Sequence, residues 1–346
     1  MKKSLSIFLA ICLFFLPSCK AKTVDSQEVF FGLHLEDGDV FLNDFLLFDQ
    51  QKISFEKFRY YYLNYKDKYL KEDPSFFENQ ENENLLKEQV VSVLLDLFAT
   101  NKLAEKHKVA ITKNDQKALE EEVQKTIKSY ENKDAFMKVL SDSHLTYDLY
   151  LDVLKSSFLN LKLFQTLFQD GGICAWNQEE FYHYYQENYL STLEIFLPFE
   201  EGENEQNHPK TMEKAQEILG KIQSRNDFYL LSEKYDRGGN TKNYPEGKPL
   251  SKEEDFYQTV SAVSIGETTQ PLLKKDGLSI IKRLEITPIH MDKNRESILF
   301  GYTDENGVRH SGAYDKNFIS LYKKEAEKIT VTYTDLWDEI STKTVF

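Results

Sequence analysis

Cysteine is scarce in this chain, which has 346 residues and 3 cysteines. Cys12 lies within an apolar segment near the start and Cys19 follows it closely, so Cys174 stands by itself in the rest of the sequence. A lone thiol allows no internal disulfide, and it does not make a metal site. We therefore expect Cys174 to be a small, partly buried residue after the Gly171-Gly172 turn.

Positive charge is also in short supply. The chain has 43 Lys and Arg against 57 Asp and Glu, which gives a net charge of −14 at pH 7. Nucleic acids require a basic face, so this balance argues against such a partner. The 7 histidines form no HxxxH or HxH pair, and the Gly238-Gly239 loop lacks the GxGxxG context of a nucleotide site. We expect no cofactor, no metal and no nucleic acid.

Long apolar runs are absent except near the start, where a mainly apolar stretch from Leu5 to Leu16 follows Met1-Lys-Lys3. This pattern is typical of a secretory signal peptide, predicted over residues 1–18, and it is too short to span a bilayer. Its end, Leu16-Pro-Ser-Cys19, resembles a bacterial lipobox with Cys19 as the lipidated residue. We expect a lipid anchor on the extracytoplasmic face of the cell membrane. The alternative is an ordinary signal peptide with an incidental cysteine.

Residues 51–190 carry apolar side chains at helical spacing. Ser54, Thr112 and Thr146 each precede such a stretch, and we predict that they are helix N-caps. A last helix is expected over residues 178–189. The clearest repeat has 4,3,4 spacing and consists of Leu86, Val90, Val93 and Leu97.

Residues 191–288 mix strand and helix patterns. In the strand Thr192–Leu197, the residues alternate, so that Glu194 and Phe196 lie on the face opposite to the aliphatic residues Leu193, Ile195 and Leu197. The elements expected after this strand are a helix bearing Met212, Ala215, Leu219 and Ile222, helices at Asp227–Tyr235 and Glu254–Val260, and strands at Gln270–Leu273 and Gly277–Glu285.

This order of elements resembles the parvulin family of peptidyl-prolyl isomerases. The run Phe256–Thr269 matches the Phe-rich helix and the Gly-Glu turn of that family, and Gly277–Lys282 matches its last strand, Gly-aromatic-His-Ile-Ile-Lys. The helical residues before it, most clearly Leu85–Gln165, are similar to the SurA/PrsA class of extracytoplasmic foldases.

The resemblance implies an α+β fold, with a mostly α-helical SurA/PrsA-like chaperone lobe and an inserted parvulin-like α/β domain. That domain is expected to have a four-stranded sheet and about three to four helices. The predicted divisions are the lipidated cysteine and tether at 19–50, the helical lobe at 51–190, the parvulin-like domain at 191–288, and a segment that completes the lobe at 289–346. The tether has some strand-like content that remains unassigned. Residues 289–314 show little periodicity, whereas Lys316–Lys328 is predicted as helix and Ile329–Tyr333 as strand.

The residues expected at the site depart from the family pattern. Glu194 stands where the family has its first-strand histidine, and Ser279 where it has its last-strand histidine. Lys252 falls at the usual pocket methionine, and Phe256 keeps the position of the aromatic floor. Because the first and last strands are neighbours in parvulin sheets, Glu194 and Ser279 should project from the same face. No residue is assigned a catalytic role with these replacements.

Isomerisation of an X–Pro bond faces a barrier of about 18–20 kcal/mol and needs no covalent step. An enzyme has to bind the twisted amide better than the planar one. The leading hypothesis is a lipid-anchored, extracytoplasmic folding factor that binds unfolded or nascent exported polypeptides, with a weak or lost isomerase. One alternative is an active isomerase that uses Phe256, Tyr244 and Glu194, and another is an adaptor lipoprotein with one dedicated partner.

Aromatic residues are plentiful, with 20 tyrosines and 25 phenylalanines. The runs Phe58–Tyr62 and Phe181–Tyr185 are dense enough to place rings on both faces of their helices. Aromatic side chains with polar tips suit adaptable contacts with peptides. Packing of the same rings into a core is the other interpretation.

Overall fold

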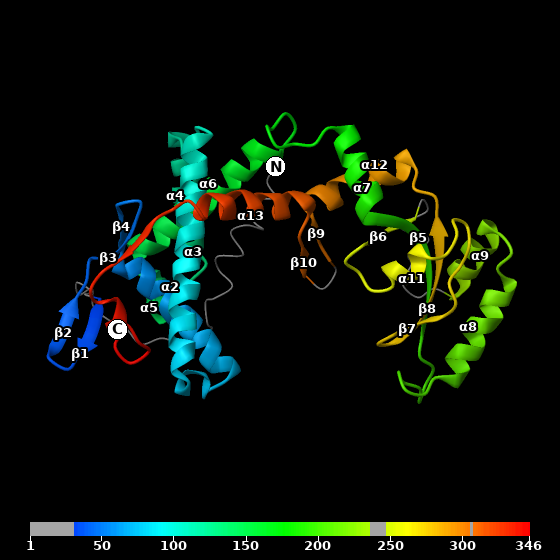
Figure 1. Ribbon diagram of the computed structural model, residues 1–346, viewed down its shortest axis with the longest axis horizontal. Coiled ribbons are helices and arrows are strands. Elements are labelled where there is room, and N and C mark those ends of the chain that lie inside the picture. The colour runs from blue at the N-terminus through cyan, green and yellow to red at the C-terminus, as the bar shows by residue number, and fades with distance from the viewer. Residues whose placement is uncertain (1–30, 236–246, 305–306) are drawn as a thin grey trace. The chain divides into compact units, whose positions relative to one another are not determined.

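The computed structural model describes residues 31–235, 247–304 and 307–346 (Figure 1). The predicted signal peptide and its lipidated residue, Cys19, lie outside these ranges, and so does Tyr244.

The chain forms two compact units. Unit 1 holds the described residues up to Ala175 together with Lys316–Phe346, and unit 2 holds Trp176–Asp315. Helix α13 (Ala313–Ala326) runs from unit 2 into unit 1. Both units combine helices with antiparallel strands, which confirms the predicted α+β class. None of the helices in the described ranges has the length and hydropathy that crossing a bilayer requires.

Unit 1 begins with short strands, not with a tether. β1 (Gly32–Leu35) pairs with β2 (Gly38–Phe41), and β3 (Asp44–Phe48) pairs with β4 (Gln51–Ser54) and with β11 (Val331–Tyr333). The prediction of a tether over residues 19–50 is therefore wrong from residue 32 onward. The side chains of β1 and β3 that are buried in the core of unit 1 are Leu33, Phe45, Leu46 and Phe48.

Helices make up the rest of unit 1. Their bounds are α2 (Phe55–Glu72), η1 (Phe76–Glu78), α3 (Gln80–Lys106), α4 (Lys113–Lys128), α5 (Lys133–Asp142) and α6 (Tyr147–Phe168). The three predicted N-caps are confirmed, because the hydroxyls of Ser54, Thr112 and Thr146 each accept a hydrogen bond from a backbone N–H in the first turn. Local capping thus fixes where α2, α4 and α6 begin.

Aromatic rings form much of the unit 1 core. On α2, Phe58 and Tyr62 are fully buried and Tyr60 is nearly so, and the Phe58 ring lies 4.9 Å from Phe45 and 6.0 Å from Trp337, between ring centroids. For these rings, packing into the core is the correct interpretation of the dense aromatic run.

The last residues of the chain are tied to α2 and α3. The Glu83 carboxylate accepts hydrogen bonds from Thr342 N at 3.0 Å and from the Tyr62 hydroxyl at 3.0 Å. Lys66 Nζ donates to Thr342 O at 2.7 Å. Val345 then forms a bridge with Leu33 of β1. Unit 1 therefore depends on contacts between segments that are far apart in the sequence.

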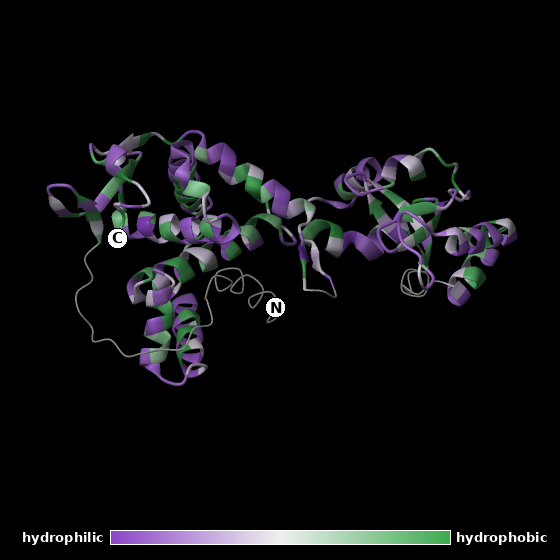
Figure 2. Ribbon diagram, turned by 90° about the horizontal axis from the view of Figure 1, so that it is seen from below, coloured by the Kyte–Doolittle hydropathy of each residue, from purple (hydrophilic) through white to green (hydrophobic). Residues whose placement is uncertain are grey.

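Unit 2 contains a four-stranded antiparallel sheet in the order β6-β5-β8-β7. The strands are β5 (Tyr189–Pro198), β6 (Lys248–Ser251), β7 (Leu272–Lys274) and β8 (Gly277–Leu284). Figure 2 shows hydrophobic and hydrophilic residues mixed along the ribbon of the chain. The pairing of β5 with β8 confirms that the first and last strands are neighbours. β6 was missing from the predicted order of elements.

Helices α8 (Pro209–Lys221) and α9 (Arg225–Tyr235) cover one face of this sheet, while the short α11 (Tyr257–Ser261) packs on β8 from the other (Figure 1). The core under α8 and α9 consists of Leu193, Ile195, Leu197, Ala215, Ile218, Phe228, Leu278, Ile280 and Leu284. The alternation of the strand predicts Leu193, Ile195 and Leu197, and the spacing of the helix predicts Ala215. The other predicted helix residues, Met212, Leu219 and Ile222, are partly buried and pack against this core.

Two more helices belong to unit 2. α7 (Gln178–Asn188) packs on β5, and α12 (Pro288–Phe300) packs on α7. For this reason unit 2 extends beyond the predicted boundaries at 191 and 288. Beyond α12, β9 (Tyr302–Thr303) and β10 (Arg309–His310) form a small hairpin.

α12 was not predicted, because residues 289–314 show little periodicity in their apolar side chains. Thr287 caps this helix through its hydroxyl, and Pro288 occupies its first turn. Its buried face includes two polar residues, His290 and Asn294, beside Met291, Ile298 and Leu299. A search for apolar repeats misses such a face, although its cap and proline are ordinary signals for the start of a helix.

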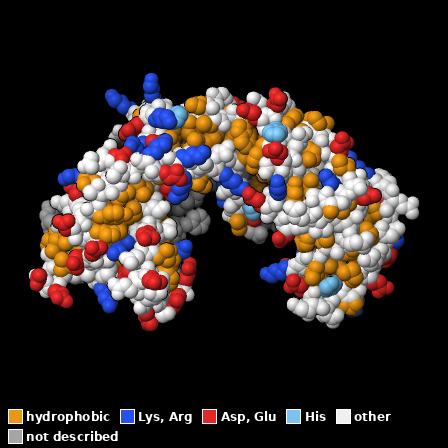
Figure 3. Space-filling model, in the orientation of Figure 1, with side chains coloured by type: hydrophobic (Ala, Val, Ile, Leu, Met, Phe, Trp, Pro, Cys, Tyr) orange, Lys and Arg blue, Asp and Glu red, His pale blue; other side chains and the backbone are white. Residues whose placement is uncertain are grey.

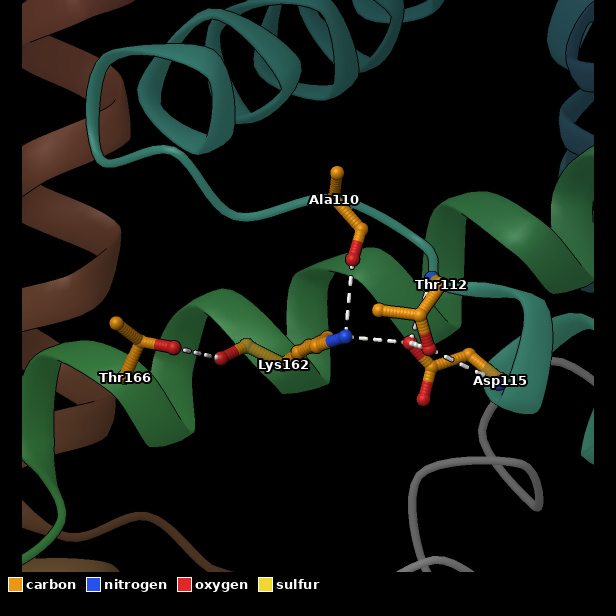
Figure 4. A network of polar contacts seen from close by, with 5 residues as sticks. All are labelled: Ala110, Thr112, Asp115, Lys162 and Thr166. Carbon is orange, nitrogen blue, oxygen red and sulfur yellow. Dashed lines mark hydrogen bonds and ion pairs between the residues drawn. The ribbon is translucent and has the colours of Figure 1, made fainter.

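A polar network joins α4 to α6 (Figure 4). Lys162 Nζ donates to the Asp115 carboxylate and, at 2.9 Å, to Ala110 O, and Asp115 in turn accepts from Thr112 N at 2.8 Å. Burial opposes ionisation of Asp115, but the hydrogen bonds from Lys162 and Thr112 outweigh it and lower the pKa from 3.8 to about 2. The ionised carboxylate therefore stabilises the folded state.

Because this pKa is lowered on folding, the contribution of Asp115 is present above pH 3.8 and is lost as the pH falls to about 2. We expect Asp115→Asn to lower the free energy of unfolding by about 1–2 kcal/mol at neutral pH. Urea unfolding followed by circular dichroism should show this difference shrinking towards pH 2. The exposed Glu121→Gln should change stability by less than about 0.5 kcal/mol. If Asp115→Asn lowered the free energy of unfolding by the same amount at low pH as at neutral pH, this account would be contradicted.

Candidate functional site

The sheet face opposite α8 and α9 carries the predicted site. Glu194 lies directly across from Ile281, and Phe196 directly across from Ser279. Residues that face each other on antiparallel strands project from the same side of the sheet. The burial of the aliphatic residues beneath α8 and α9 therefore turns all four of these side chains to the other face.

Glu194 and Ser279 project from the same face, as predicted, and they are also in direct contact. The Ser279 hydroxyl donates a hydrogen bond of 2.5 Å to Glu194 Oε1, and Lys274 Nζ donates to the same oxygen. Ser279 is fully buried, and the Glu194 side chain is 14 % exposed against 35 % for Lys274. Lys274 Nζ also lies 6.0 Å from the centroid of the Phe196 ring. We call Glu194, Lys274 and Ser279 the polar triad.

The chemistry of the polar triad differs from that of two facing imidazoles. A histidine ring can accept and donate a proton near neutral pH, and its two nitrogens can bridge neighbouring groups. In the triad, one carboxylate oxygen is shared by an ammonium and a hydroxyl. This arrangement orders the face and supplies charge, but it does not provide an acid–base pair of the kind that histidines form.

Phe256 lies beside the triad in an apolar cluster. It is half-buried and packs on Leu190, Leu250, Val260 and Ile281. Its backbone φ is 67°, in the left-handed region, where it precedes α11. Bulky residues rarely adopt this conformation, and strain of this kind gathers at binding sites. Since Ile281 faces Glu194 across the strands, the apolar cluster and the triad adjoin on one face.

The other predicted site residues are not brought together in this way. Lys252 is exposed in the turn after β6, where its N–H donates to Asn188 O at 2.8 Å. Tyr244 lies outside the described residues. The structure thus joins Glu194 to Ser279, with Phe256 beside them, and leaves Lys252 in solvent.

Lys274 is the member of the triad that sequence reasoning missed. The predicted strand ended at Leu273, one residue too early. Leu272 pairs with Ser279 and Lys274 pairs with Gly277, so period-2 alternation places Leu272 and Lys274 on the Ser279 face. A strand extended by one residue would have revealed the counter-charge of Glu194.

A buried histidine also went unrecognised. The Nε2 atom of His290 lies 2.6 Å from the Tyr185 hydroxyl, and Nδ1 lies 3.4 Å from Ser191 Oγ. All three residues are fully buried, and burial raises the pKa of Tyr185. This cluster ties α12 and α7 to β5, and Tyr185, like Phe181, belongs to the core.

Cysteine and metal chemistry receive no support in the described ranges. Cys174 is half-buried, and burial raises the pKa of its thiol, which disfavours the reactive thiolate. Among residues 31–235, 247–304 and 307–346, no group of three or more His, Cys, Asp or Glu side chains is arranged to hold a metal ion.

Comparison with known proteins gives matches to solved structures and to nothing else. No family model matches the sequence, and no curated protein matches it. The foldase protein PrsA from Streptococcus pneumoniae is 13 % identical, with coverage of 80 % of this chain and 85 % of that one and a TM-score of 0.31. The peptidylprolyl isomerase (PrsA) from Bacillus anthracis is 18 % identical, with coverage of 68 % of this chain and 88 % of that one and a TM-score of 0.25.

PrsA from Bacillus subtilis is 15 % identical, with coverage of 85 % of this chain and 89 % of that chain and a TM-score of 0.25. At TM-scores this low, these likenesses establish neither the fold nor the function of this chain.

The ion pair of the triad should make a measurable contribution to stability. In a double-mutant cycle of Glu194→Gln and Lys274→Met, we expect a coupling energy of about 1 kcal/mol, because both groups are partly shielded from water. Guanidinium unfolding of the four proteins measures it. The same cycle on the exposed pair Lys117 and Glu121, whose charged atoms are 3.9 Å apart, should give less than about 0.5 kcal/mol. Equal coupling in the two cycles would mean that the triad is only a surface ion pair.

Proposed function

We propose that this protein is a lipid-anchored, extracytoplasmic folding factor that binds unfolded secreted polypeptides, and that its parvulin-like domain has weak or no isomerase activity. The observation that carries this proposal is the polar triad. At the two positions where the resemblance expects histidines, the chain has a carboxylate and a hydroxyl that are hydrogen-bonded to each other and to Lys274.

The energetics of isomerisation support the loss of catalysis. Enzymes that accelerate bond rotation have to prefer the twisted amide over the planar amide. The ring of Phe256 and its apolar neighbours offer a surface for proline, and they would bind both forms. Without groups that respond to the twisted amide, such binding is uniform and leaves the barrier nearly unchanged.

Binding of polypeptide is supported by exposed apolar and aromatic side chains in unit 1. Tyr333 is 47 % exposed, and its ring centroid lies 4.4 Å from that of Trp337, which also contacts Phe45 and Phe58 of the core. The rings are thereby held rigidly at low entropic cost. Figure 3 shows hydrophobic side chains exposed among charged ones on the displayed face of unit 1. A mixed surface of this kind suits weak contacts with many sequences.

The net charge of −14 favours basic segments among the bound polypeptides, since opposite charge raises the rate of encounter. Attachment through Cys19 and export through the signal peptide rest on the lipobox resemblance in the sequence. The half-buried, strained Phe256 favours the alternative of an active isomerase with a variant pocket.

Proline-limited refolding separates these two functions. We expect the protein to accelerate the slow phase of an unfolded client by less than about twofold, because the triad offers no preference for the twisted amide. The measurement is fluorescence-detected refolding, with a fully active isomerase as the positive control. Strong acceleration that Phe256→Ala abolishes would instead establish the enzyme.

Suppression of aggregation tests the binding of unfolded chains. In light scattering with a chemically unfolded client, excess protein should reduce aggregation, and Tyr333→Ser should weaken the effect, because it removes an exposed ring of unit 1. Tyr302→Ser in unit 2 is the matched control, since Tyr302 is 51 % exposed against 47 % for Tyr333. No suppression at excess protein would count against the proposal. Co-purification of a single stoichiometric protein would favour the adaptor alternative.

A further inference from the structure

Strand β11 forms one edge of the three-stranded sheet of unit 1, whose order is β11-β3-β4. Within the described residues, β11 pairs with β3 and with no other strand. A strand in this position presents a row of backbone N–H and C=O groups to which a further strand can bind. The question is which of these groups are available and what they would bind.

The hydrogen bonds of the ladder determine which groups face outward. Asp49 N donates to Thr330 O at 3.0 Å. Hydrogen-bonded pairs recur at every second residue of an antiparallel ladder, so Thr332 is the next residue that bonds to β3. Val331 and Tyr333 therefore direct their N–H and C=O groups away from β3. These four groups have no hydrogen-bond partner among the described residues.

The sequence of this edge favours strand pairing. Residues 330–334 read Thr-Val-Thr-Tyr-Thr, and β-branched and aromatic residues have high β propensity. Natural sheets often block their edges with lysine or proline, and β11 contains neither. The opposite edge, β4, carries the exposed Lys52 and leads directly into α2. The β11 edge therefore lacks the protection that the β4 edge has.

The side chain of Tyr333 adds an apolar contact to the edge. It is 47 % exposed, and its ring centroid lies 4.4 Å from that of Trp337. Trp337 is in turn stacked on the buried Phe45. Side chains that face each other on adjacent antiparallel strands interact, so a side chain of an added strand could pack on the Tyr333 ring.

The surroundings of the edge are acidic. Glu88 of α3 is exposed, as are Asp335 and Asp338 after β11. Burial raises the pKa of Tyr333, and the negative charge of Glu88 raises it further, which places Glu88 close to the edge. Lys87 is 7 % exposed, and its Nζ lies 5.4 Å from the centroid of the Trp337 ring. The exposed charge therefore complements a segment that contains Lys or Arg.

We propose that β11 binds an extended, basic segment of an unfolded polypeptide as an added strand. The outward N–H and C=O groups of Val331 and Tyr333 would form the hydrogen bonds, and the Tyr333 ring would pack on a side chain of the segment. Binding through backbone groups tolerates many side chains, because every polypeptide has the same main chain. This inference rests on the proposed binding of unfolded polypeptides and assigns that binding to one edge of unit 1.

Fluorescence anisotropy of the full chain with a labelled hexapeptide tests the proposal. The peptide alternates valine and threonine between two terminal lysines. We expect its affinity to fall about tenfold when its backbone amides are N-methylated, because methylation removes the donors and keeps the side chains. Replacing the terminal lysines with glutamates should lower the affinity about fivefold, because the surroundings of the edge are acidic.

A proline on β11 tests the same edge from the side of the protein. Val331→Pro removes an N–H that faces away from β3, and edge strands accept proline at such a position. We expect the peptide to bind about tenfold more weakly to Val331→Pro. Val331→Thr, which keeps the N–H and the β-branched shape, is the matched control and should change the affinity by less than about twofold. The methylated peptide needs only the wild-type protein, so the test stays valid if Val331→Pro fails to fold.

Equal affinity for the methylated and unmethylated peptides would overturn the proposal, and so would equal affinity of wild type and folded Val331→Pro. If wild type still suppressed the aggregation of an unfolded client, the proposed function would stand without this site. Methylation-sensitive binding without any suppression of aggregation would support the β11 site and count against the proposed function. A wild-type dimer in sedimentation velocity that Val331→Pro dissociates would assign the edge to a second copy of the chain and overturn the proposal.

Discussion

The alternation of side chains along β5 and β8 is the constraint on which unit 2 depends. Leu193, Ile195 and their partners on β8 must be buried beneath α8 and α9, and a slip of one residue would reverse every side chain on the strand. The same register turns Glu194 and Ser279 to the opposite face. The hydrophobic effect therefore positions a polar cluster that it does not itself stabilise.

The two faces of the sheet differ chemically as a result. One face presents the polar triad beside a half-buried phenylalanine, and the other buries Lys282 on the side of α8 and α9. Both faces place a lysine against an oxygen acceptor, but Lys274 is partly in water whereas Lys282 is nearly fully buried. Loss of hydration destabilises an ammonium more where water is excluded, so Lys282 depends more strongly on its acceptor, the Gly266 carbonyl.

Sequence patterns predicted those elements whose apolar residues are regular. The strand that contains Glu194, the helix caps at Ser54, Thr112 and Thr146, and the Ser279 strand all follow from period or cap chemistry. β6 was not predicted because it is four residues long and contains Pro249. α12 was not predicted because His290 and Asn294 lie on its buried face. The surroundings of Lys282 could not be predicted, since Gln223 and Gly266 come close to it only through packing.

The discontinuity of unit 1 has a consequence for biosynthesis. β3 pairs with β11, and Glu83 accepts a hydrogen bond from Thr342. In both cases the partner is synthesised long after β3 and Glu83 have left the ribosome. Until then, β3 presents an open edge of the kind on which other chains assemble. Unit 2 is continuous in sequence and has no such delay. The newly made protein thus passes through the same aggregation-prone interval from which a folding factor shields its clients.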